Sequence, residues 1–157
     1  MDKKVLVEKL KKLIVSFEDD NKPFSVVLLI ANTPGSIETD YKLIISAPWM
    51  DDLSSYDAIG LIIDKIIAQE NSTNSILYKK LIPILPIRST DSSILKVISD
   101  FDVGVNDKTI LLTNYPFSNI VIEDGIVVVA QNIKSKKPTF TKQIDYHTQY
   151  YTNSTLN

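Results

Sequence analysis

The stretch from Tyr41 to Gln69 constrains the fold more than any other part of this 157-residue sequence. It begins with the strand pattern Tyr-Lys-Leu-Ile-Ile-Ser-Ala and continues through Pro48-Trp-Met-Asp-Asp-Leu53 into an apolar segment. Ser54 followed three residues later by Asp57 is a helix-start signal, because the serine oxygen can accept a free N–H group and the acid faces the positive end of the helix dipole. The stretch therefore predicts a strand, a turn and a helix over 55–69.

The rest of the chain also alternates between strand and helix patterns. The segment Phe24–Ala31 is apolar on both faces, which is typical of a central strand covered on both sides. Pro83 and Pro86 lack N–H donors, so their strand is expected near an edge of the sheet or irregular at its start. The predicted elements are a helix over 3–17, strands over 24–31 and 41–47, a helix over 55–69, a strand over 81–88, a helix opened by Thr90 or Asp91, and strands over 108–113, 119–122 and 126–130.

This order, αββαβαβββ, predicts an α/β domain on the border of α+β, with three helices on a mixed sheet of five to six strands. The central βαβαβ run implies parallel strands joined by right-handed crossovers. The first two strands are expected to form an antiparallel hairpin with a long loop, and Asp124-Gly125 predicts a tight hairpin between the last two. Residues 1–131 are expected to form one globular domain. Residues 132–157 are expected to be a polar tail, loosely attached or docked, whose deletion leaves the fold intact.

Composition argues against several classes of protein. The chain has no cysteine, which removes disulfides, thiolate metal sites and a cysteine nucleophile. Its single histidine, His147, lies in the tail and does not fit a Ser-His-Asp triad or a histidine-ligated zinc site. The net charge of −2 argues against binding to duplex nucleic acid. Without a membrane-length apolar run or a signal-peptide pattern, the protein is expected in the cytoplasm and off the membrane. Its many lysines and single arginine are typical of an AT-rich bacterial genome.

A candidate ligand site follows from the predicted topology. The loops at the carboxyl ends of parallel strands gather on one rim of an open α/β sheet, and here they are 48–55 and 88–93. Two helix N-termini at this rim would favour an anion, and the aspartates could hold a magnesium ion together with waters. Helix capping and ordinary ion pairs explain the same residues without a ligand. The candidate ligand-binding residues are Trp49, Asp51, Asp52, Tyr56, Arg88, Thr90 and Asp91.

A second enzymatic hypothesis comes from Asp40-Tyr-Lys42. This tripeptide is similar to the D-x-K element of PD-(D/E)XK nucleases, in which two carboxylates hold the metal and a lysine orients the water. The companion acid is expected on the preceding strand, but Phe24–Ala31 has none. Three-residue matches are also common by chance, so the match alone assigns no activity.

Two functions remain open. The first is a non-enzymatic protein-interaction or regulatory module without a cofactor, acting as a homodimer or with another protein. It follows from the helix over 55–69, whose apolar set is wider than one stripe and needs cover from the N-terminal helix or a second subunit. That set is Ile59, Leu61, Ile62, Ile63, Ile66 and Ile67. The alternative is a small enzyme, either a nuclease or one acting on another phosphate-containing substrate, with magnesium as its cofactor; it requires Asp51, Asp52 and Asp91 to converge in a polar cleft.

Overall fold

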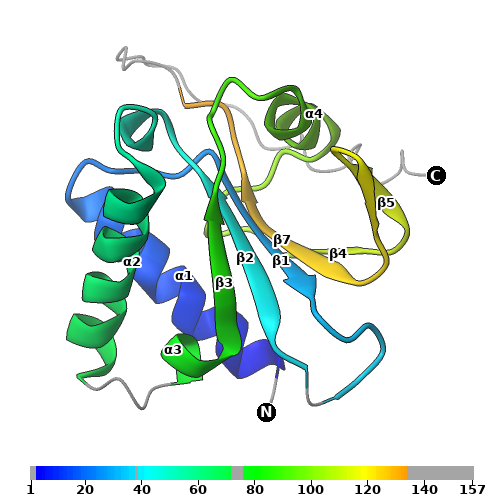
Figure 1. Cartoon of the computed structure of the whole chain (residues 1–157), viewed down its shortest axis with the longest axis horizontal. Coiled ribbons are helices and arrows are strands. Elements are labelled where there is room, and N and C mark those ends of the chain that lie inside the picture. The colour runs from blue at the N-terminus through cyan, green and yellow to red at the C-terminus, as the bar shows by residue number, and fades with distance from the viewer. Residues whose placement is uncertain (1–2, 38, 72–75, 134–157) are drawn as a thin grey trace.

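A computed structural model of the chain describes residues 3–37, 39–71 and 76–133 (Figure 1). Its centre is a five-stranded sheet in which β2 and β3 run parallel and the other neighbours run antiparallel. In spatial order the strands are β3 (Leu81–Pro86), β2 (Tyr41–Ser46), β1 (Val26–Ala31), β7 (Gly125–Ala130) and β4 (Ile110–Leu112). A separate two-stranded ribbon pairs β5 (Tyr115–Phe117) with β6 (Ile120–Ile122).

Each face of the sheet has its own cover (Figure 1). One face packs against α1 (Lys3–Asp19), α2 (Ser55–Glu70) and α3 (Ile76–Lys80). The other face packs against α4 (Ser92–Asp100) and the β5–β6 ribbon. Strand β1 is buried along its whole length, with Val27 and Leu29 in the core under the helices and Val26 and Leu28 in the core on the other face. The continuous apolar pattern of this strand is therefore the consequence of two cores meeting at one strand.

The predicted class and several local features are confirmed. The fold is a mixed sheet with three long helices, the first two strands form an antiparallel hairpin, and β3 is an edge strand. Ser54 caps α2 by accepting a hydrogen bond from the Asp57 N–H at 3.0 Å. Asp91 caps α4 by accepting from the Ser93 N–H at 2.9 Å. Between β2 and α2 the chain makes a single turn of 3-10 helix, Pro48–Met50.

The prediction of a second parallel crossover, from β3 to the next strand, is wrong. Strand β4 does not extend the sheet beside β3 but lies at the opposite edge, antiparallel to β7. The edge of β3 explains this. The Ile87 N–H donates to the Ile45 carbonyl of β2, so the preceding residue, Pro86, faces away from β2 where a further strand would need an N–H donor. The chain instead passes Val103, which pairs with Ala130 at the end of β7.

The predicted tight hairpin at Asp124-Gly125 is also wrong. Strand β6 pairs with β5 rather than with β7, and the residue that turns between β5 and β6 in the left-handed region is Ser118. Gly125 is the first residue of β7 and pairs with Ile30 and Leu112. It is needed for a close approach, because a Cβ there would lie 2.8 Å from the carbonyl oxygen of Leu29.

Most of the predicted tail, residues 134–157, lies outside the described part of the chain, so its role and the domain boundary remain predictions. Among the residues that are described, no helix has both the length and the apolar character needed to cross a membrane.

Candidate functional site

The rim predicted from the parallel strands exists, because β2 and β3 end at the same edge of the sheet. The loops that follow them are held together by Asp51, whose carboxylate accepts hydrogen bonds from the Ser89 N–H at 2.9 Å and from the Ser89 hydroxyl. Asp51 and Arg88 also line one small cavity of about 180 Å³. Asp51 and Arg88 thus border the same cavity, and the hydrogen bonds from Ser89 to Asp51 fasten the two loops to each other.

Asp91 has a structural role in the same loop. Its carboxylate accepts from both the N–H and the hydroxyl of Ser93 at the start of α4. The hydrogen bond from the Ser93 hydroxyl, together with that from the N–H, holds the pKa of Asp91 below its usual range. Capping therefore accounts for this carboxylate.

Trp49 belongs to the core rather than to the rim. Its indole stacks on Phe17 with ring centroids 5.6 Å apart and meets the edge of Phe24 at 5.6 Å. Its Nε1 donates to the carbonyl of Pro23 at 2.9 Å, which satisfies the one polar atom of the ring. The tryptophan anchors the turn before α2 onto α1.

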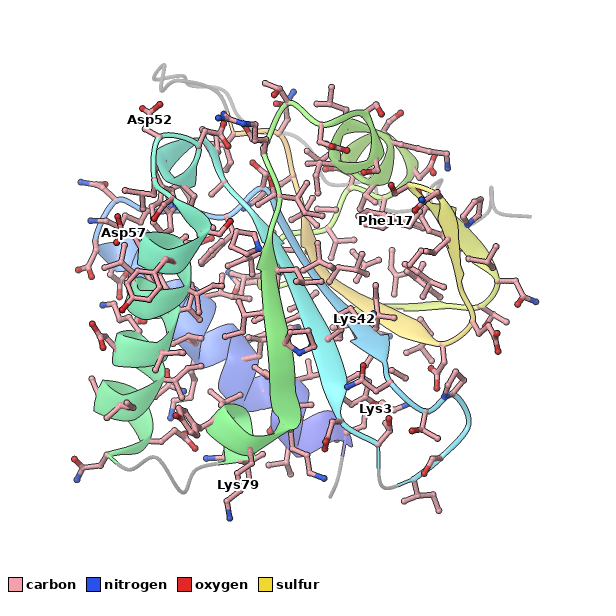
Figure 2. All side chains as sticks on the ribbon, viewed as in Figure 1. Lys3, Lys42, Asp52, Asp57, Lys79 and Phe117 are labelled. Carbon is pink, nitrogen blue, oxygen red and sulfur yellow. The ribbon has the colours of Figure 1, made fainter. Side chains whose placement is uncertain are left out.

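The remaining candidates do not converge. Asp52, Tyr56 and Thr90 are exposed, Tyr56 with 86% of its surface accessible, and Asp52 points away from the protein at the rim (Figure 2). In the described part of the chain, no three or more acidic or histidine side chains are grouped so that they could hold a metal ion. Asp51, Asp52 and Asp91 thus do not form the three-carboxylate magnesium site that the enzyme hypothesis requires.

The nuclease-like tripeptide is similarly dispersed. Asp40 pairs with Lys80 at 3.2 Å. Lys42 lies on the sheet face opposite α1, α2 and α3, as the alternation with Tyr41 and Leu43 requires (Figure 2). The Asp40 carboxylate is therefore paired with a lysine from α3. Among the described residues, it is not part of any cluster of side chains that could hold a metal ion.

Magnesium is expected to leave the melting temperature unchanged, apart from ionic screening. Asp51 and Asp91 already accept hydrogen bonds, and Asp52 is solvated. The measurement is a melting curve with about 10 mM magnesium against matched ionic strength; a specific site would add about 2.7 kcal/mol at a hundredfold excess over its dissociation constant. A rise in the wild type that disappears in Asp52→Asn would instead favour the enzyme hypothesis.

The two adjacent aspartates are expected to differ in their contribution to stability. Asp51→Ala removes the acceptor for both Ser89 donors and should lower the free energy of unfolding by about 1–2 kcal/mol. Asp52→Ala, at an exposed position, should change it by less than about 0.5 kcal/mol. Urea denaturation of the two variants measures the difference, and equal losses would show that Asp51 does not fasten the loops.

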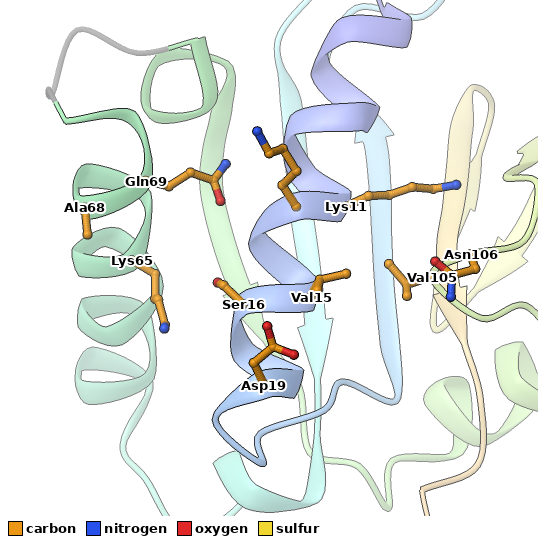
Figure 3. Close-up of a pocket in the computed structure, with 10 residues that line it drawn as sticks. Lys11, Val15, Ser16, Asp19, Lys65, Ala68, Gln69, Val105 and Asn106 are labelled. Atoms are coloured by element: carbon orange, nitrogen blue, oxygen red, sulfur yellow. The ribbon is translucent and has the colours of Figure 1, made fainter.

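A hollow of about 620 Å³ lies along α1, between α2 and the loop around Val105 (Figure 3). Three of its polar side chains already make contacts within the protein. Lys11 donates to the Asp107 carbonyl at 2.8 Å, Lys65 pairs with Asp20 at 2.6 Å, and the Gln69 amide donates to the Lys9 carbonyl at 3.1 Å. These contacts hold the helices and the loop together, which gives the three side chains a structural role.

The more distinctive surface is a groove of about 210 Å³ between α2 and the edge strand β3. All its lining residues are apolar or aromatic: Ile59, Ile63, Ile66, Leu77, Tyr78, Leu81, Pro83 and Ile84. The sequence had singled out three of them as part of the over-wide apolar set of the helix. The sequence did not predict that α3 and β3 form the opposite wall of the groove. The available signal for the groove was the excess of apolar residues in the helix over 55–69.

No protein-family model, no curated protein and no solved structure matches this chain. The function is therefore argued from the surface and its chemistry alone.

Proposed function

We propose that this protein is a non-enzymatic protein-interaction module that docks its partner on one side of α2. The docking surface, called here the α2–β3 surface, consists of the groove described above and the outward stripe of α2 formed by Tyr56, Gly60, Ile63 and Ile67. The observation that carries the proposal is the wall of the groove, in which every lining side chain is apolar or aromatic. A continuous apolar wall of this kind is typical of a surface that packs against another apolar surface.

The apolar side of α2 extends well beyond what the core uses. Ala58, Ile62 and Ile66 are each 1% exposed and form the stripe that packs on the sheet. At about 100° per residue, the stripe from Tyr56 to Ile67 lies on the adjacent face of the same helix. Of its side chains, Ile63 and Ile67 are half-buried and Tyr56 is exposed. The helix therefore has a second apolar face, although a monomer needs only the first one to pack on the sheet.

The edge of β3 indicates how a partner would bind. Pro83 and Pro86 remove two N–H donors from the strand, which weakens it as a template for an added strand. Docking is therefore expected through side-chain packing against α2 and the groove. This mode corresponds to an amphipathic helix laid into a hydrophobic groove.

A cytoplasmic location is part of the same proposal, which holds whether the partner is another protein or a second copy of this chain. The alternative, a magnesium-dependent enzyme, is less well supported, because the carboxylates it needs have capping and loop-fastening roles. An interaction module needs no such set. Its function lies in the shape and apolar character of its docking surface.

The experiment is a titration of the protein, at about 20 µM, with a synthetic amphipathic helical peptide that has leucines on one face and lysines on the other. Isoleucine δ1 methyl resonances are followed by NMR. The expected result is a change at Ile59, Ile63 and Ile84, which is lost in Ile63→Asp and retained in Ile120→Asp, the same substitution at an exposed isoleucine outside the docking surface. Perturbation confined to other methyl groups, or none up to about 1 mM peptide, would contradict the proposal.

A further inference from the structure

We infer that the partner of the α2–β3 surface is a second copy of this chain, bound so that the two α2 helices cross antiparallel about a two-fold axis between Gly60 and Ile63. This inference rests on the proposed docking surface and names its occupant. Three observations support it: the spacing of the outward stripe, an unexplained glycine within it, and the charges that lie near the start of α2 and, on α3, beyond its end.

The outward stripe suits an antiparallel copy of itself. Its members Tyr56, Gly60, Ile63 and Ile67 are separated by four, three and four residues, a spacing that is the same in both directions. A two-fold axis midway between Gly60 and Ile63 places each glycine opposite the isoleucine of the other copy. It also places each Tyr56 opposite Ile67. Every contact then joins two apolar residues, and the large Ile63 meets the one position without a side chain, as in knob-into-hole packing.

Gly60 has no explanation within the described part of the chain. A Cβ at this position would meet no heavy atom within 4 Å, so no contact there requires glycine. Its φ is not in the left-handed region either. In a helix interior, glycine is less favourable than alanine by about 0.8–1.0 kcal/mol. A second helix approaching closely at Gly60 supplies the missing reason, since the absent side chain lets two backbones come together.

The charges favour the antiparallel orientation over the parallel one. Asp52 and Asp57 lie at the start of α2, and Lys79 lies beyond its end in the last turn of α3 (Figure 2). Glu70, the acid at the far end of the helix, is already paired with Lys9 at 3.2 Å. An antiparallel copy brings the acidic end of one chain toward the basic end of the other and opposes the two helix dipoles. A parallel copy would bring like charges together.

Single-cysteine cross-linking tests the arrangement cleanly, because the chain has no cysteine of its own. In the two-fold arrangement, the two copies of residue 63 are offset by about 4.5 Å along the helix axis, and the two copies of residue 56 or 67 by about 16 Å. On mild oxidation, Ile63→Cys is therefore expected to form a disulfide-linked dimer. Tyr56→Cys alone and Ile67→Cys alone are expected to remain monomeric on a non-reducing gel, whereas their mixture, with one of them tagged, should form the mixed dimer.

Gly60→Ala provides an independent readout. It should raise the melting temperature of the dilute chain, because alanine favours the helix, yet weaken dimerisation by about tenfold, because the added methyl group separates the helices. Self-linking of Tyr56→Cys and Ile67→Cys would show a parallel dimer and overturn the inferred geometry. The absence of any cross-link in all three variants and the mixture would exclude a second copy as the occupant. In either case, peptide binding at Ile59 and Ile63 would still support the docking surface itself, so the two proposals fail separately.

Discussion

Replacing Phe17 with alanine is expected to lower the free energy of unfolding by about 3–5 kcal/mol. Phe17 is 2% exposed and joins α1 to the turn before α2. Its ring lies 5.2 Å from Phe24 in an edge-to-face contact and stacks on Trp49 at 5.6 Å. The substitution removes one of the three mutually contacting rings of this cluster, so it combines a lost transfer free energy, an internal cavity and two lost aromatic contacts.

Urea denaturation followed by far-ultraviolet circular dichroism measures this loss, and the fluorescence of Trp49 reports on the same cluster. The matched control is Val15→Ala on the same helix, where the side chain is 37% exposed and the expected change is within about 0.5 kcal/mol. A loss for Phe17→Ala no larger than that of the control would mean that the cluster does not fasten α1 to the sheet.

Gly125→Ala is expected to destabilise the fold by about 1–3 kcal/mol despite adding only one methyl group. The new Cβ would lie 2.8 Å from both the Leu29 carbonyl oxygen and a methyl carbon of Ile122. The carbonyl belongs to the central strand β1, so relief of the clash must move backbone on which β2 and β7 pair. Thermal denaturation checks this, with Gly60→Ala as the control because its Cβ meets nothing within 4 Å. If Gly125→Ala is as stable as the wild type or more stable, β7 can shift away from β1 and the prediction is wrong.

The features predicted correctly from the sequence depend on short stretches of chain. The apolar run of β1 requires cover on both faces whatever its neighbours are, and Ser54 and Asp91 cap helices through contacts within three residues. Pro83 and Pro86 place β3 at an edge because each removes a ladder donor. These constraints act locally, so they can be inferred from the sequence of each segment.

The features predicted wrongly depend on distant parts of the chain. Asp124-Gly125 has the composition of a tight hairpin, but Gly125 is required because Leu29, nearly a hundred positions earlier, approaches too closely for a side chain. The position of β4 depends on the blunt edge of β3 and on the pairing of Val103 with Ala130. Neither the approach nor the pairing has a local sequence signal.

The candidate site shows the same division. The topological rule for parallel strands located the rim, and Asp51 and Arg88 line one cavity there. The rule could not show that Trp49 packs on Phe17, or that Ser89 and Ser93 donate hydrogen bonds to the carboxylates of Asp51 and Asp91. The excess of isoleucine in the helix over 55–69 was visible in the sequence, but the groove it forms with Leu81 and Ile84 required the strand to be placed beside it.

Sedimentation velocity between about 1 µM and about 200 µM tests the central claim most directly, that the α2–β3 surface is a protein-docking surface with a second copy as its partner. The wild type is expected to shift with concentration from the 17.7 kDa monomer toward twice that mass. Ile63→Asp, which places a charge in the docking surface, should remain monomeric, whereas Leu111→Asp, at a residue 67% exposed on β4, should associate as the wild type does. A wild-type protein that stays monomeric throughout, or an Ile63→Asp variant that associates as strongly as the wild type, would contradict the account.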